Sequence, residues 1–196
     1  MKNEFIESLR DNPIVAYAVK HLADSGLAFH GNVTCDHYRD NSLIHTQSGK
    51  NTFTTEGMNY LLEIIFGTTS KAGSAIFYVG IFKTNASVST SSTAAVCLGA
   101  GGTFGECQDA DYTPATDKPV YTIAAAAAAA CTNAASAASF TIVISSATIY
   151  GAFLSTAKAK TATSGYLMAA KKFGTSRGVV TADVLAVTYV VSATTS

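Results

Sequence analysis

The chain has 196 residues; 48% are hydrophobic, 13% are charged, and 13 basic residues balance 13 acidic ones. This length suits one core with an additional arm, and the even charge excludes a global field that would attract nucleic acid or an anionic membrane. No apolar run reaches the ~18 residues of a membrane span, and residues 1–12 do not resemble a signal peptide. We therefore expect a protein that is made in the cytoplasm and does not enter a membrane.

The first predicted element is a helix over residues 12–26. Asn12 and Pro13 are typical of a helix start, and Gly26 of a helix end. Apolar side chains at helical spacing form one stripe: Ile14, Tyr17, Ala18 and Leu22. Because such a stripe must pack on something, we expect residues 1–27 to form a helical arm that anchors the chain or contacts another copy. Residues 28–196 then form the main domain.

A β-hairpin and a second helix are predicted next. Residues 27–39 and 43–49 are rich in β-formers, and the turn sequence Asp-Asn-Ser separates them. Residues 52–67 favour a helix that Thr54 or Thr55 caps and Gly67 ends. Its expected buried face consists of Met58, Leu61, Leu62 and Ile65, with Phe66 at the edge.

The remaining chain is predicted to be β-structure with one long excursion. Residues 74–83 are a compact apolar run, typical of a buried strand, whereas the Gly- and Ser-rich residues 84–119 predict a surface loop with one short strand at most. From Phe140 onward the hydrophobic period is two, and further strands are expected near residues 148–155, 165–173 and 183–191. We predict a mainly β fold: a jelly-roll-like antiparallel β-sandwich with one internal helix and an N-terminal helical arm.

Seven consecutive alanines occupy residues 124–130. Alanine is the best helix former, but seven residues fall well short of the ~12–15 needed for a marginally stable helix. Alanine also offers no large apolar face for packing. We therefore predict an irregular segment or an edge strand here.

The sequence offers several weak metal-site patterns. The cysteines (Cys35, Cys97, Cys107 and Cys131) contain no Cys-x-x-Cys pair, which favours small buried hydrophobes over a zinc site. His37 and His45 flank the hairpin turn beside Asp36 and Asp40, but a full ligand set is missing. Three carboxylates lie in the long loop without the glycine turn of a calcium loop: Asp109, Asp111 and Asp117. We predict no metal and no cofactor.

No catalytic motif stands in a suitable context. The glycines of "GAGGTFGE" lack phosphate-loop spacing, and the Ser-x-x-Lys of Ser155 and Lys158 closes a predicted strand instead of opening a helix. We therefore do not expect an enzyme.

Five basic residues gather toward the end of the predicted C-terminal sheet: Lys158, Lys160, Lys171, Lys172 and Arg177. They indicate either a solvated strand edge, where lysines discourage unwanted pairing, or a surface that meets a carboxylate-rich partner. The candidate partner contacts are accordingly Ile14, Tyr17, Leu22, Lys171, Lys172 and Arg177.

Four segments together follow a recognisable pattern. "TTEGMNYLLEIIFG" is followed by "FYVGIFK", and "FTIVISSATIYGAFLS" precedes the closing "SRGVVTADVLAVTYVV". This order resembles a family of tailed-bacteriophage virion proteins, small β-sandwiches that serve as capsid decoration (cement) proteins or as head or tail fibre components. The alanine tract and the first fifty residues depart from the family pattern. The family has no catalytic residues.

The resemblance implies a non-enzymatic capsid decoration subunit that binds the outer capsid surface and stabilises the shell. Its partners would be the major capsid protein or other virion proteins and copies of itself, as a homodimer or homotrimer, with no nucleic acid or membrane. Its location would be the virion. The alternative is a head or tail fibre module that adheres to host surface glycans through residues 99–117.

Overall fold

The computed structural model describes residues 27–67, 77–114 and 116–195. The chain divides into two units, Met1–Phe29 with Ala193–Ser196, and His30–Ser192. The predicted arm and its stripe residues Ile14, Tyr17 and Leu22 lie outside the described residues. The second unit contains the sheets and the core, and two of its strands continue into the first unit.

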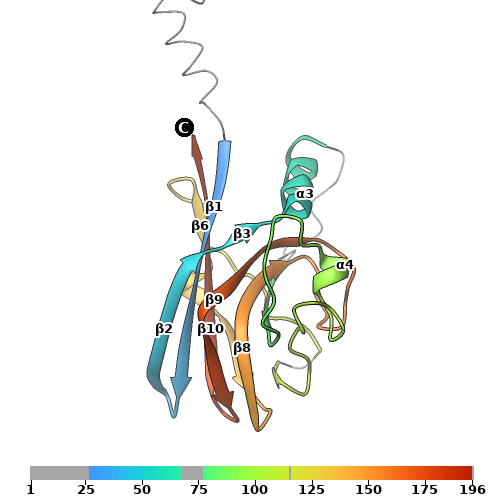
Figure 1. Ribbon diagram of the computed structural model, residues 1–196. Helices are drawn as coiled ribbons and strands as arrows, with labels where there is room; N and C mark the ends of the chain where they lie inside the picture. Colours follow the sequence, from blue (N-terminus) through green and yellow to red (C-terminus); the bar gives the residue numbers. More distant parts are fainter. Residues whose placement is uncertain (1–26, 68–76, 115, 196) are drawn as a thin grey trace, which may run out of the picture. The chain divides into compact units, whose positions relative to one another are not determined.

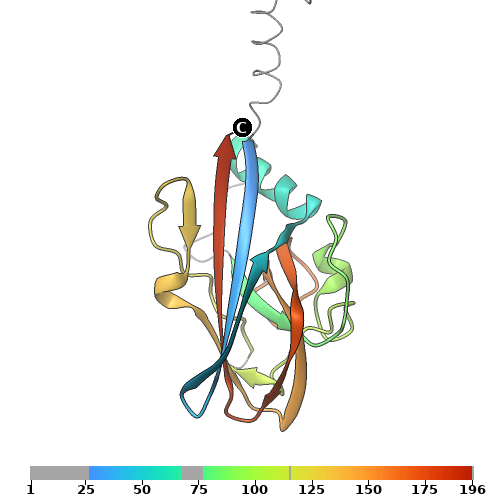
Figure 2. The same ribbon diagram turned by 60° about the vertical axis from the view of Figure 1, so that its left-hand side comes forward.

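The fold is mainly β, as predicted, with two antiparallel sheets (Figures 1 and 2). The first sheet has the order β2-β1-β10-β7-β5, with β6 also beside β10. Its strands are β1 (Leu27–Arg39), β2 (Ser42–Lys50), β5 (Tyr112–Thr113), β6 (Ala130–Thr132), β7 (Ala138–Ile142) and β10 (Val184–Thr195). The second sheet, in the order β3-β9-β8-β4, has β3 (Thr52–Phe53), β4 (Tyr78–Phe82), β8 (Ser146–Ser155) and β9 (Leu167–Val180).

The main core draws side chains from both sheets, which makes the fold sandwich-like. In β7 the predicted alternation is confirmed, since Phe140 and Ile142 are buried while Thr141 is exposed. The predicted buried strand is also confirmed, because every residue of β4 is buried. The core includes Val33, Val79, Ile81, Phe140, Leu154, Met168, Leu185, Val187 and Tyr189.

The predicted hairpin is confirmed as β1 and β2. Arg39 pairs with Ser42, so the connection is the two-residue turn Asp40–Asn41. Both turn residues have positive φ, 50° and 61°. Asn and Asp tolerate this left-handed region better than other non-glycine residues, and the hairpin's twist requires it.

The predicted internal helix is α3 (Thr55–Phe66), and the Thr54 side chain caps it by accepting a hydrogen bond from Gly57 N at 2.9 Å. The predicted buried face was right in part: Leu61 packs against the core, but Leu62 and Ile65 are 46% and 54% exposed, and Phe66, predicted at the edge, is 79% exposed. The buried residues of the helix are Gly57 and Tyr60. A Cβ on Gly57 would lie 2.5 Å from Met168 Cα, so the close approach of α3 to β9 needs the glycine there.

Residues 84–119 are not the surface loop that the sequence predicted. They contain a short helix, α4 (Ala94–Cys97), and a second core cluster formed with residues of β4, β8 and β9. Its members are Phe82, Ala94, Cys97, Leu98, Phe104, Phe153, Ala157, Leu167 and Ala170. The rings of Phe82 and Phe104 stack with centroids 4.6 Å apart. The many glycines and serines make the average composition of the segment polar. The few apolar side chains that anchor it to the core therefore do not stand out in the sequence.

The alanine run is irregular, as predicted. Residues 124–129 are exposed, and Ala127 and Ala130 exchange backbone hydrogen bonds of 2.9 Å across a tight turn. Ala128 and Ala129 hold positive φ values of 49° and 54°. The turn leads into β6, and a 3-10 turn at Ala134–Ser136 follows.

Candidate functional site

A buried ion pair lies at the centre of the segment that follows β4. Lys118 Nζ lies 2.7 Å from Glu106 Oε1 and also donates to Ala159 O at 2.6 Å, while Gly99 N donates to Glu106 Oε2 at 2.7 Å. Burial raises the pKa of Glu106 and lowers that of Lys118, and the attraction between the two charges opposes both shifts. Because both side chains are buried and bonded within the chain, the pair ties loops together and does not meet a substrate.

The three loop carboxylates are also committed to internal pairs. Asp111 is buried and pairs with Lys83 at 2.7 Å. Asp117 pairs with Lys158 at 3.0 Å, and Asp109 lies 3.3 Å from Lys160. The sequence favoured exposed, solvated carboxylates over a calcium loop for these three residues, and the burial of Asp111 corrects this. In the described residues no group of three His, Cys, Asp or Glu side chains is arranged to hold a metal ion.

The two hairpin histidines are directly opposite each other, His37 on β1 and His45 on β2. They do not form a metal site. His37 Nε2 lies 2.9 Å from Asp183 Oδ2, and Arg177 contacts its other ring nitrogen at 3.2 Å. With Nδ1 accepting from the guanidinium, Nε2 carries the proton donated to Asp183.

Asp183 is the hub of this cluster at the β9–β10 turn. Arg39 donates two hydrogen bonds to it at 2.8 and 2.7 Å, and Val180 N donates a third at 2.9 Å. The hydrogen bonds from Arg39 hold the pKa of Asp183 well below its usual range, although burial opposes them. The cluster joins β1 to the β9–β10 turn and is structural.

The cysteines largely follow the prediction. All four are free thiols; Cys35, Cys97 and Cys107 are buried and Cys131 is half-buried. The Ser-x-x-Lys pattern also has no catalytic geometry, since the Ser155 hydroxyl bonds to Ala157 O and Lys158 pairs with Asp117.

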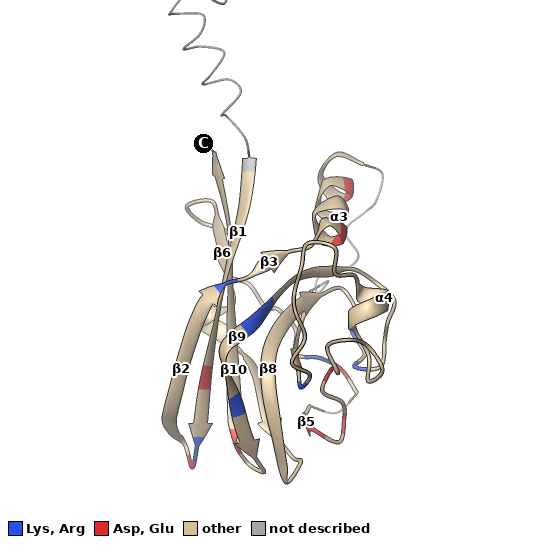
Figure 3. Cartoon of the chain, in the orientation of Figure 1, with Lys and Arg blue, Asp and Glu red and all other residues tan. Residues whose placement is uncertain are grey.

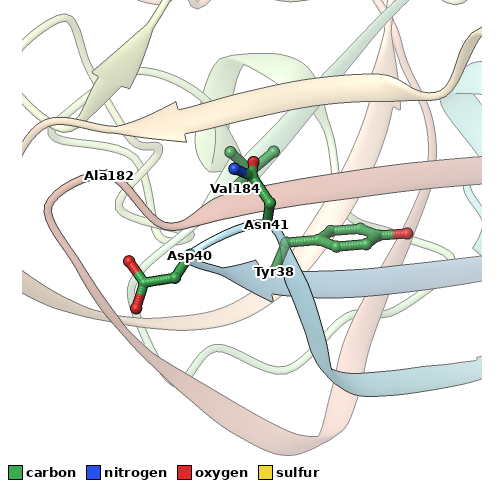
Figure 4. A pocket seen from close by; sticks show the side chains of 5 residues that line it. All are labelled: Tyr38, Asp40, Asn41, Ala182 and Val184. Atoms are coloured by element: carbon green, nitrogen blue, oxygen red, sulfur yellow. The ribbon is translucent and has the colours of Figure 1, made fainter.

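A depression of about 530 Å³ lies between the β1–β2 and β9–β10 turns (Figure 4). Its lining is Tyr38, Asp40, Asn41, Ala182 and Val184. Figure 4 shows the Asp40 carboxylate and the Tyr38 ring pointing in opposite directions. The polar groups of this depression therefore do not converge on one ligand position. The presence of Asp40 and Asn41 is explained by the left-handed backbone of the hairpin turn.

The broadest candidate surface is the outer face of the first sheet, formed by the residues that alternate with its buried ones. It includes Asn32, Thr34, Asp36, Thr46, Ser48, Lys50, Ser139, Thr141, Ala186, Thr188 and Val190. Asp36 and Lys50 are the two charged residues among these eleven, and Thr46 donates a 2.7 Å hydrogen bond to Asp36. Figure 3 shows how few charges lie along β2 and β10. This outer face carries hydroxyl and small apolar groups.

The predicted basic cluster is not one cluster. Lys158 and Lys160 pair with loop carboxylates, and Arg177 bonds to His37. Of the predicted partner contacts in the described residues, Lys171 and Lys172 remain together, on β9. Sequence reasoning missed this outer face, because the sequence of a single strand does not reveal which strands become its neighbours.

Comparisons with known proteins gave no match: no family model, no curated protein and no solved structure is similar to this chain. Among the described residues, no helix has the length and apolarity to span a membrane.

Proposed function

We propose that the chain is a non-enzymatic structural protein of a bacteriophage virion, a decoration (cement) subunit that binds the outer capsid surface and stabilises the shell. The phage assignment comes from the sequence resemblance. The observation that carries the structural role is the outer face of the first sheet, where eleven residues from four strands include only one acidic and one basic residue. Jelly-roll connectivity, a helical N-terminal arm and assembly with copies of itself belong to the same proposal.

The physical basis of this proposal is that a partner can cover such a face at a low cost in desolvation free energy. The centres of protein interfaces are depleted in charged residues, because each buried charge must be desolvated. Thr, Ser, Ala and Val are small, so a flat partner can approach the strands closely. The internal ion pairs support the same role, because charges that are paired within the protein do not repel a partner surface.

The alternative, a glycan-binding fibre module, has less support from the geometry. Its proposed contact loop, residues 99–117, turns Phe104, Glu106 and Tyr112 inward. The depression beside Tyr38 does not bring its polar groups together.

A cryo-EM map of particles that carry the protein is the direct test, with the outer face expected against the shell in many copies. Thr188→Glu places a carboxylate at the middle of the face and should abolish co-purification with particles. Ser176→Glu adds the same charge at an exposed site on β9 and should leave attachment unchanged. Few copies located at a tail, or attachment that survives Thr188→Glu, would contradict the proposal.

A further inference from the structure

A second pocket, of about 280 Å³, lies beside the start of β9. Four segments build it: the end of β2, strand β3, the chain after β4, and β9. Its lining is Lys50, Thr52, Ser87, Val88, Ala170, Lys171 and Lys172. Three lysines, a threonine and a serine therefore line one small space, and no Asp or Glu is among its lining residues.

The pairing of β3 with β9 assembles this pocket. Thr52 pairs with Ala170, and Lys50, two residues before Thr52, lines the same pocket as Lys171 and Lys172, which follow Ala170. Strands β2 and β9 approach closely here: a Cβ on Gly49 would lie 3.0 Å from Lys171 Nζ. The glycine before Lys50 thus leaves room for the Lys171 side chain to lie against β2.

The lysines of the pocket differ from the other lysines of the described residues. Four of the seven have carboxylate partners: Lys83 with Asp111, Lys118 with Glu106, Lys158 with Asp117, and Lys160 with Asp109. The remaining three line this pocket. In a chain with so little charge, a group of like charges without a counter-charge lowers its repulsion by taking up an anion.

We propose that this pocket binds a phosphate group. A phosphate monoester carries −1.5 to −2 charges at pH 7 and three acceptor oxygens, so it neutralises more of three ammonium groups than one carboxylate does. Each ammonium offers up to three donors, and the Thr52 and Ser87 hydroxyls add more. The half-buried Val88 gives the carbon-bearing side of an ester an apolar contact. This inference does not depend on the virion role proposed above.

The test is titration of the full-length protein with inorganic phosphate and pyrophosphate, followed by calorimetry and amide NMR shifts at constant ionic strength. We expect saturable binding that weakens as salt rises, with shifts centred on residues 50–52 and 170–172. Lys50→Gln combined with Lys171→Gln and Lys172→Gln should weaken binding at least about tenfold. Lys158→Gln removes an exposed lysine paired elsewhere and should change affinity less than about twofold.

Because the three lysines are not in the core, the triple variant should keep the wild-type circular dichroism spectrum. Absence of saturable binding up to about 10 mM ligand, or equal binding by the folded triple variant, would overturn the proposal. Two further probes identify the source of the phosphate: glucose 6-phosphate for a glycan, and phosphatidic acid vesicles against phosphatidylcholine vesicles for a lipid headgroup. If either probe binds more tightly than inorganic phosphate, the result supports the site and identifies the source of the phosphate group. If neither does, the result supports a site for the free phosphate ion.

Discussion

Gly80 on β4 and Phe153 on β8 are directly opposite each other, and the Phe153 ring lies where a Cβ of residue 80 would stand, 2.1 Å from Cζ. Two residues along, the relationship is reversed, because Phe82 covers Gly151 at the same distance. Each ring therefore fills the space that the opposite glycine leaves open.

Replacing either glycine with alanine should overpack this pair of strands. We expect Gly80→Ala to lose about 1–3 kcal/mol of unfolding free energy. Gly151→Ala should lose more, since its Cβ would also lie 2.3 Å from the Lys171 carbonyl oxygen. Gly174→Ala, with nothing within 4 Å of the new Cβ, is the control. Urea denaturation measures all three, and equal stability of Gly80→Ala and Gly174→Ala would contradict the packing described.

Breaking the buried pair of Glu106 and Lys118 should be costly, while removing both charges should not. Lys118→Met leaves the Glu106 carboxylate buried without its cation, for an expected loss of about 3–5 kcal/mol. Adding Glu106→Gln should restore a large part of that loss, because Gln still accepts a hydrogen bond from Gly99 N. A double-mutant cycle of unfolding free energies measures the coupling. Additive losses would show that the two charges do not interact.

Asp183 should make stability depend on pH in the acid range. Its pKa is lower in the folded chain than the ~3.9 of an unfolded chain. Its carboxylate therefore contributes stability above about pH 4, and that contribution is lost as pH falls toward the folded-state pKa. Asp183→Asn should cost about 3 kcal/mol at about pH 6, and the difference from wild type should shrink by about pH 3. A difference that stays constant across this range would argue against the cluster.

Thiol labelling should separate Cys131 from the other three cysteines. Burial raises the pKa of Cys35 to about 12 and that of Cys107 well above its usual range, so neither forms the reactive thiolate near neutral pH. We expect a thiol reagent to modify one equivalent in the native protein and four in urea. Cys131→Ala should remove the native reaction. Rapid native labelling of a second thiol would place a buried cysteine at the surface.

The alanine run offers a test whose sign distinguishes a turn from a helix. Ala128 and Ala129 hold left-handed backbone angles, which cost a non-glycine residue roughly 1–2 kcal/mol each. Ala128→Asn with Ala129→Gly supplies the preferred turn sequence and should stabilise the protein by about 0.5–1 kcal/mol. In a helix the same glycine would destabilise by about 1 kcal/mol. Thermal denaturation shows whether the double substitution stabilises or destabilises the protein. Ala126→Gly, which lies outside the turn, should give no gain in stability.

Short-range patterns in the sequence were enough to predict several local elements. The two-residue turn at Asp40–Asn41, the Thr54 cap of α3 and the alternation in β7 all depend on residues a few positions apart. The alanine run was also predictable, because its length is too short for an independent helix.

Contacts between residues far apart in the chain become visible only in the folded sheets. The apolar stripe of α3 was only partly right, since Leu61 packs on the core while the close approach of Gly57 to Met168 keeps Leu62 and Ile65 at the surface. His37 and Asp183 are 146 residues apart, and the pairing of Thr52 with Ala170 places Lys50 at the same pocket as Lys171. A pattern along one segment indicates its type of secondary structure and part of its buried face. The register between segments, which places charges together, arises only when the sheets form.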